Sequence, residues 1–353
     1  MGYGSYQASD WQKLKKSRNL GASNNASQTF TRKEISEKLN SRFIGIRESF
    51  DSEDSPNSTP VILGFDVTGS MGYLANEIAT KSLNETITRI ISEKVVDDPH
   101  LMCAAFTSET DPMQITQFEA DIRVVEQLLD FVLGGGNRYS FDNLLWYFAA
   151  KHTKIDSFKK RGKKGILIGI GDEICGGESN FLCPAAIENV FKDTVSKDIQ
   201  FYEAYEMASE QYEIAHIVIG PDYRFDEINP RNSYKGWNEA IPGRVAKISS
   251  NNVDKLDDVI IAVMKLIKGE TKDSILDSIK DSDTRKVVSY AIEDMHISSA
   301  KASKVVKRSE VKGAVDSGAA QGSDKTAGVT YTPLDGRKKT LREKINDLWS
   351  NRK

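Results

Sequence analysis

One stretch of the chain decides its fold class: Val61-Ile-Leu-Gly-Phe-Asp66-Val-Thr68-Gly-Ser70-Met71-Gly72. The apolar run before Asp66 predicts a strand that is buried on both faces. Asp66 ends this strand, and hydroxyl side chains follow at alternate positions, Thr68 and Ser70. Because ligands of α/β sheets bind just beyond the carboxyl ends of the strands, these three oxygen-bearing side chains are expected to converge on one point.

Strands and amphipathic helices alternate along the chain after this stretch. Apolar strands are predicted at Leu101 to Phe106, Gly165 to Gly171, Ile214 to Ile219 and Arg244 to Ile248, and a helix at Asp254 to Ile267. The near-continuous apolarity of the strands is typical of parallel sheets whose two faces are covered by helices. The sequence therefore predicts an α/β fold with a doubly wound, mostly parallel, Rossmann-like sheet flanked by helices.

The oxygen ligands of the first strand favour a hard divalent cation. Carboxylate and hydroxyl oxygens suit Mg²⁺ or Mn²⁺ better than a softer metal. Four histidines show no metal-ligand spacing, and His216, which alternates with apolar residues, is predicted to be a core residue. Gly169 and Gly171 lack the third glycine of a dinucleotide-binding fingerprint, so nucleotide binding is not indicated.

The segment Asp66-Val-Thr68-Gly-Ser70 resembles the metal-ion-dependent adhesion site of von Willebrand factor A domains. The resemblance extends over about residues 59–268 and is particularly close to prokaryotic members at Leu145 to Ala150 and Arg161 to Gly165. It implies metal ligands at Asp66, Thr68, Ser70 and Asp172, the last of which follows a later strand. The family places a Thr in a glycine-rich loop, where this chain has Gly134 to Ser140, so Asn137 or Ser140 would replace that ligand.

Such a donor set is suited to binding. Two carboxylates and several neutral hydroxyls leave a dication under-neutralised, so the Asp or Glu side chain of a protein partner is the favoured additional ligand. The motif holds no base that could activate a water, which metal-assisted hydrolysis requires, so we expect no enzyme activity. The family resemblance further implies a prokaryotic, cytoplasmic protein that works in a multiprotein assembly, for example beside an AAA+ ATPase.

Three other interpretations use the same residues. In the first, the role of Asp66, Thr68 and Ser70 is purely structural, and they cap the helix that follows them. Asp66 could instead be the nucleophile of a phosphoryl-transfer enzyme of haloacid-dehalogenase type, with Thr68 as a phosphate ligand, although that class usually has a second Asp at the position of Thr68. The chain could also be a structural scaffold with a vestigial metal site.

Length and composition restrict the class of protein to which the chain can belong. The chain has 353 residues, of which 39% are hydrophobic and 28% charged, as in globular proteins. No apolar run approaches the length of a membrane span, and three cysteines do not form a disulfide framework, so a cytoplasmic location without membrane contact is expected.

The charge is unevenly distributed along the chain. Residues 1–34 carry six Lys/Arg and two Asp/Glu, residues 301–353 carry thirteen and six, and the segment between them carries 29 and 43. We predict a basic, polar arm over residues 1–58 with a helix at Thr31 to Leu39, and the von Willebrand factor A-like domain over 59–268. A helical extension over 269–300, a flexible basic linker over 301–338 and an amphipathic helix over 339–353 would follow. We do not expect such short basic ends to bind nucleic acid.

Overall fold

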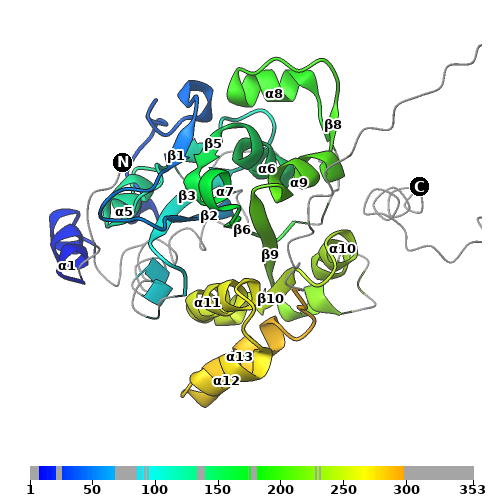
Figure 1. Cartoon of the computed structure of the whole chain (residues 1–353). Coiled ribbons are helices and arrows are strands. Elements are labelled where there is room, and N and C mark those ends of the chain that lie inside the picture. The colour runs from blue at the N-terminus through cyan, green and yellow to red at the C-terminus, as the bar shows by residue number, and fades with distance from the viewer. Residues whose placement is uncertain are drawn as a thin grey trace, which may run out of the picture.

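The computed structural model describes residues 8–20, 26–67, 95–132, 140–173, 181–226 and 232–297, with residues 86, 87, 89, 90, 93, 175 and 229 between them. Its centre is a sheet of six strands within this described part, in the order β10-β9-β6-β2-β3-β4. All neighbours are parallel except β4, which pairs with β3 in the antiparallel sense. Figure 1 labels the parallel strands β10, β9, β6, β2 and β3. The strands are β2 (Thr59–Asp66), β3 (Pro99–Phe106), β4 (Gln114–Ile115), β6 (Gly165–Gly171), β9 (Tyr212–Gly220) and β10 (Val245–Ser249).

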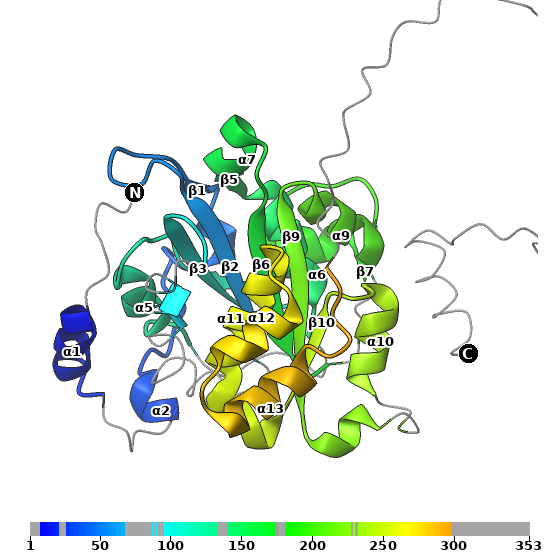
Figure 2. The ribbon, with the colours of Figure 1, turned by 60° about the horizontal axis from the view of Figure 1, so that its bottom comes forward.

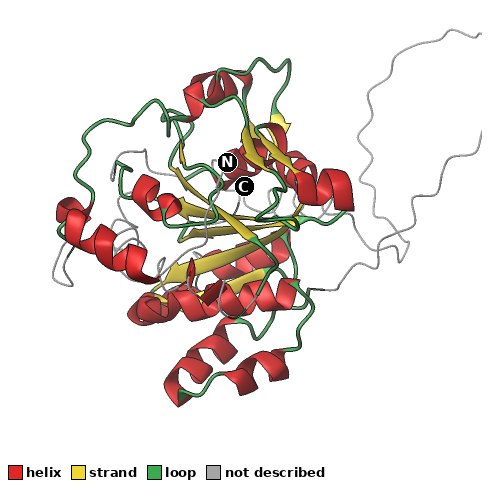
Figure 3. Ribbon diagram, turned by 60° about the vertical axis from the view of Figure 1, so that its left-hand side comes forward, coloured by secondary structure: helices red, strands yellow, loops and turns green. Residues whose placement is uncertain are grey.

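Helices cover both faces of this sheet, which confirms the predicted doubly wound α/β fold (Figure 3). One core contains side chains of α1 (Ala8–Ser17), α5 (Arg123–Leu128), α11 (Leu256–Ile267) and α13 (Ser282–Ala291). The other contains side chains of α6 (Asp142–Lys151), α8 (Pro184–Phe191), α9 (Phe201–Ser209) and α10 (Ser233–Ala240). Successive residues of β2 enter opposite cores, Val61 and Leu63 the first and Ile62 the second, as the period of a strand requires.

The strand order places a switch point between β2 and β6. From β2 the chain proceeds to β3 and β4 on one side of the sheet, and then returns to β6, β9 and β10 on the other side. At such a point the connections leave in opposite directions, which opens a crevice at the carboxyl ends of the two central strands. The register pairs Phe65 with Ile170, so the ends of β2 and β6 lie side by side.

The segment before β2 contributes to the folded body. Trp11, Leu14 and Leu20 are buried in the first core, and β1 (Arg47–Ser49) pairs in parallel with β5 (Thr153–Ile155). The helix predicted at Thr31 to Leu39 is wrong, because these residues form bends and turns. The Leu39 carbonyl accepts from Ile115 N–H of β4, so tertiary pairing overrides the local helix preference.

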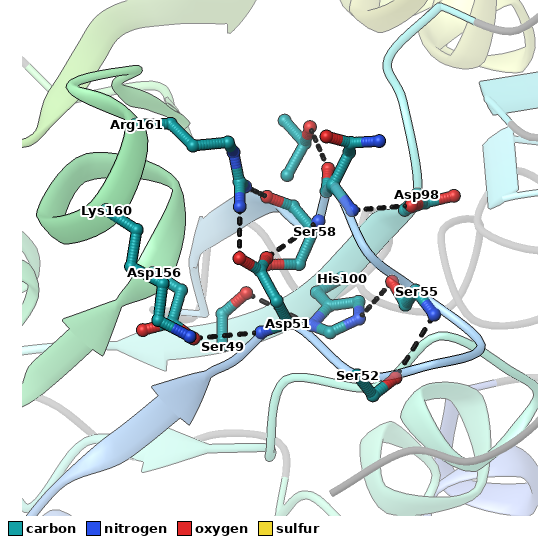
Figure 4. Close-up of polar contacts among 12 residues, drawn as sticks. Ser49, Asp51, Ser52, Ser55, Ser58, Asp98, His100, Asp156, Lys160 and Arg161 are labelled. Carbon is teal, nitrogen blue, oxygen red and sulfur yellow. Dashed lines mark hydrogen bonds and ion pairs between the residues drawn. The ribbon is translucent and has the colours of Figure 1, made fainter.

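A buried polar network closes the amino end of the sheet (Figure 4). His100, near the start of β3, lies between Ser49 and Ser55, whose hydroxyls are each 3.0 Å from a ring nitrogen. Asp51 binds Arg161 and accepts a 2.8 Å hydrogen bond from Ser58. The network ties the segment before β2 to α7 (Asp156–Arg161) and to β3.

Residues 269–297 pack against the same body. They contain α12 (Lys272–Ser278) and α13, which lie beside α11 (Figure 2). Ile275, Val288 and Ile292 are buried in the first core. Lys247 of β10 lies 4.6 Å and 4.5 Å from the ring centres of Tyr234 and Tyr290, which adds a cation–π contact across this junction.

The remaining elements are short. They are α2 (Ala26–Thr29), β7 (Phe181–Leu182) and β8 (Ile199–Gln200), and the 3₁₀ helices Ser41–Phe43, Asp222–Phe225 and Ser250–Lys255. Among the described helices, none has the length and apolarity that crossing a membrane requires.

The helical extension should be part of the cooperative fold. Ile292→Ala removes a fully buried side chain and is expected to lower the free energy of unfolding by about 2–5 kcal/mol. Lys286→Ala, at a lysine whose side chain is 77% exposed, is the matched control and should change it by less than about 0.5 kcal/mol. Chemical denaturation measures both variants, and equal effects would show that the extension is not coupled to the core.

The His100 network should make stability depend on pH. Burial lowers the pKa of His100, and the carboxylates of Asp98 and Asp51 offset this only in part. Below the unfolded pKa of about 6.5, the unfolded state therefore binds a proton that the folded state does not. As the pH falls below about 6.5, the free energy of unfolding should therefore decrease by up to about 1.4 kcal/mol per pH unit, until the pH reaches the pKa of His100 in the folded state.

His100→Gln should flatten this dependence, as measured by denaturation between about pH 7 and pH 5. Ser55→Ala is the control, because it removes one hydrogen bond of the imidazole but leaves the titrating group in place. It should lower stability at every pH while retaining the slope. A His100→Gln variant with the wild-type slope would contradict the assignment.

Candidate functional site

The described members of the predicted metal site lie at the carboxyl edge of the sheet. Asp66 ends β2 and is 1% exposed, and Asp172 follows β6. Ser140 is buried just before α6, where Phe141 N–H donates to Thr107 O beyond the end of β3, at 2.9 Å. Because β6, β2 and β3 are neighbours, all three residues lie at the same edge, at the switch point. The other predicted ligands, Thr68, Ser70 and Asn137, lie outside the described residues.

A further carboxylate, which the sequence analysis did not identify, lies at this edge. Asp142 begins α6 and is 7% exposed. Burial raises the pKa of Asp142 well above its usual value, and the nearby carboxylates of Asp66, Glu173 and Asp172 raise it further. An acidic residue in the first turn of a helix is common, so its sequence position alone does not indicate a site.

Asp142 faces a buried histidine. The distance from Asp142 Oδ1 to His216 Nδ1 is 3.7 Å, and the His216 ring stacks on Trp237 with ring centres 3.7 Å apart. Burial lowers the pKa of His216 to about 3, so the imidazole is neutral at physiological pH. His216 is therefore buried as predicted, but its Nε2 finds no hydrogen-bond partner within the described part of the chain.

Two glycines of β6 make room for these side chains. A Cβ atom at Gly169 would lie 2.9 Å from His216 Nδ1, a distance that real Cβ atoms do not show. A Cβ atom at Gly171 would lie 3.2 Å from Asp66 Cβ. The Gly-x-Gly pattern, which carries no nucleotide signal, thus has a steric reason: a Cβ at position 169 would displace His216, and one at position 171 would crowd Asp66.

The polypeptide after β6 is held from the other side by α10 and the loop after β9. Asp172 O accepts from Ser233 Oγ at 2.9 Å and from Arg224 Nη1 at 3.2 Å. Glu173 O accepts from Trp237 Nε1 at 3.1 Å. These bonds fix the backbone of both acidic residues beside the end of β2.

The donor atoms at this edge suit a hard divalent cation. Ser140 Oγ and Asp142 Oδ1 are buried and have no hydrogen-bond partner within the described ranges, and Asp66 and Asp172 supply carboxylates. No three His, Cys, Asp or Glu side chains among the described residues come close enough together to hold a metal ion by themselves. A metal would therefore depend on the hydroxyl-bearing segment after Val67 as well as on the described carboxylates. The chemistry of the donors thus fits Mg²⁺ or Mn²⁺ and does not favour a softer metal.

Comparisons with known proteins give distant similarities. No protein-family model and no curated protein matches the chain. Among solved structures, it is similar to a von Willebrand factor type A protein from Catenulispora acidiphila, at 16% identity over 64% of this chain and 48% of that one, with a TM-score of 0.35.

Two further similarities are of the same kind. The pilus adhesin SpaC from Lactobacillus rhamnosus GG matches at 13% identity over 65% of this chain and 31% of that one, with a TM-score of 0.37. Proximal thread matrix protein 1 from the mussel byssus, solved with zinc in its MIDAS motif, matches at 13% identity with a TM-score of 0.33, over 58% and 48%. The chain spans about half or less of each of these three proteins.

The raised pKa of Asp142 predicts an unusual response to substitution. Above the unfolded pKa of about 3.9, the unfolded carboxyl ionises while the folded one retains its proton, so Asp142 lowers stability as pH rises. Asp142→Asn should therefore raise the free energy of unfolding at pH 7. The gain should shrink toward pH 4, as denaturation at several pH values would measure.

Asp257→Asn is the matched control. Asp257 is also buried in the first turn of a helix, but its Oδ2 accepts a 2.9 Å hydrogen bond from Arg89 Nη1. Removal of its charge should lower stability at pH 7. A loss of stability in Asp142→Asn as well would show that the Asp142 carboxylate is ionised and bound in the folded protein.

Proposed function

We propose that this chain is a metal-dependent protein-interaction module of the von Willebrand factor A type. The observation that carries the proposal is that Asp66 ends β2 and Asp172 follows the neighbouring β6, at the switch point between these two strands, where the sequence motif Asp66-Val-Thr68-Gly-Ser70 begins. Mg²⁺ or Mn²⁺ would be held by Asp66, Thr68, Ser70 and Asp172, with Asn137 or Ser140 completing the set.

The electrostatics of this edge support a cation. Asp66, Asp172 and Glu173 gather beside the buried Asp142, whose pKa is raised first by burial and further by these neighbouring carboxylates. A bound dication supplies positive charge that offsets this repulsion and offers a coordination position to an incoming oxygen ligand. The role of the chain's own residues is to hold the carboxylates in place and to keep the surrounding core dry.

The described residues support binding more than turnover. The imidazole nearest to the carboxylates, His216, is 2% exposed, and burial keeps its pKa at about 3. A general base for water activation needs a pKa near the working pH and a position within reach of the water. His216 is therefore not a suitable general base, and we infer a binding role rather than an enzyme activity.

The same charge argument indicates the chemistry of the partner. A protein partner that presents an Asp or Glu side chain would complete the metal site. An AAA+ ATPase or another component of a cytoplasmic, prokaryotic multiprotein assembly is the class of partner that the sequence resemblance suggests.

Direct metal binding and partner capture test the proposal together. Mn²⁺ binding to wild type and to Asp66→Asn is measured by calorimetry, and partner capture from native extract is compared in Mg²⁺ and in EDTA. Loss of a residue that hydrogen-bonds to a metal ligand typically costs about 10–100-fold in metal affinity. Loss of the Asp66 carboxylate, which would contact the metal itself, should therefore cost about 100-fold or more. Capture should disappear in EDTA and in Asp66→Asn.

The control is Asp283→Asn, at an aspartate whose side chain is 80% exposed on α13, and it should bind Mn²⁺ and the partner as wild type does. Metal-independent capture would contradict the proposed mechanism and favour a scaffold with a vestigial site. Trapping of a phosphorylated or beryllofluoride-bound Asp66 would instead favour the phosphoryl-transfer alternative.

A further inference from the structure

A groove of about 540 Å³ lies between α9, the end of α6 and the loop 194–199. Val195, Ile199 and Met207 give it an apolar lining. Lys151, the last residue of α6, also lines the groove, whereas Asp142 at the start of the same helix belongs to the candidate metal site. A helix of this length spans about 15 Å, so the groove is a separate surface.

One side of the groove is a row of glutamates on α9. Glu203, Glu206 and Glu210 are three and four residues apart, so they lie on one face of the helix. Glu203 forms a 3.7 Å pair with Lys197, but both side chains are partly or largely exposed, and such pairs contribute little. Glu206 and Glu210 are exposed and form no ion pair with any other described residue. Lys151 and Lys197 also line the groove, so the three glutamates leave it a net charge of −1 beside its apolar lining.

The chain itself contains a segment of matching chemistry. Residues 339–353 place apolar side chains at helical spacing and basic side chains around them. The apolar residues are Leu341, Ile345, Leu348 and Trp349, and the basic ones are Lys339, Arg342, Lys344, Arg352 and Lys353. With the acidic Glu343 and Asp347, the side chains of the segment carry a net charge of +3.

We propose that the groove along α9 is the docking site of the chain's own C-terminal segment, residues 339–353. Apolar side chains of the segment would enter the groove beside Met207, and its basic side chains would face the α9 glutamates. This inference does not depend on the metal site, because it uses neither its residues nor its ligand.

The length of chain between the two elements permits this contact. The described chain ends at Ile297, next to His296, whose N–H donates to Gly243 O just before β10. The 41 residues from 298 to 338 separate it from the segment. A flexible chain of that length spans roughly 35 Å, comparable with the diameter of the folded body. Its effective concentration is in the millimolar range, so a segment with a Kd of about 0.1 mM would be docked roughly ten times more often than free.

The other cavity of comparable size fits this segment less well. It measures about 420 Å³ and is lined by the segment before β1 and by Asp130. Asp130 is already paired with Arg18 and Arg32, at 3.1 Å and 3.3 Å. Glu37 lies next to Lys38 in the same lining. Little uncompensated negative charge remains there for a basic segment.

Hydrogen–deuterium exchange of the full chain, followed by mass spectrometry, tests the docking. In wild type, amides of residues 341–349 should exchange about tenfold more slowly than in an isolated peptide of the same sequence. Trp349→Ser should abolish this protection and also speed exchange in the loop 194–199. The double variant Glu206→Lys/Glu210→Lys should remove the protection from the other side.

The control is Glu53→Lys/Asp54→Lys, which reverses two exposed acidic charges that do not line the groove and should leave the protection intact. The proposal would be overturned if residues 341–349 of wild type exchanged as fast as the isolated peptide. It would also be overturned if Trp349→Ser left the exchange rate of the loop 194–199 unchanged. Protection that decreases when the protein is diluted about tenfold would also overturn it, because the occupant would then be the segment of a second copy.

Discussion

Like charge gathered at one edge of a parallel sheet is the constraint on which the rest of the site depends. Asp66 and Asp142 are buried, and Asp172 and Glu173 stand close enough to raise the pKa of Asp142. Carboxylates in a low-dielectric region cannot all ionise without a compensating positive charge. The fold must therefore supply a proton, as at Asp142, or provide for a cation. The glycine at 171, which leaves the Asp66 side chain its position over β6, serves that requirement.

The sequence predicts the central architecture because the relevant signals are local. The apolar run before Asp66 and the run Gly165 to Gly171 are long enough to be recognised as buried strands, and both are strands in the structure. Parallel order then follows from the alternation of strands with helices, and it brings Asp66 and Asp172 to one edge without further information. Residues that end neighbouring strands are thus predictable as a group.

The features that sequence reasoning missed depend on contacts across the fold. The Thr31 to Leu39 segment has a helix-like start signal, yet its backbone pairs with β4, more than seventy residues later. Asp142 resembles an ordinary first-turn residue, and only the packing of α6 over β6 brings it within 3.7 Å of His216. Such residues acquire their properties from neighbours that are distant in sequence, and no local pattern encodes them.

The two ends of the sheet differ in the polar side chains that they bury. At the amino end, His100 is enclosed by Ser49 and Ser55, and Asp51 is bound by Arg161, so these polar side chains are satisfied within the chain. At the carboxyl end, Ser140 Oγ and Asp142 Oδ1 are buried without a hydrogen bond within the described structure. Unsatisfied buried polar atoms cost about 1–3 kcal/mol each, and a folded domain retains few of them without a reason. Ser157 Oγ of α7, at the amino end, is also buried without a hydrogen bond among the described residues. The feature that distinguishes the carboxyl edge is therefore the gathering of Asp66, Asp172 and Glu173 around the buried Asp142.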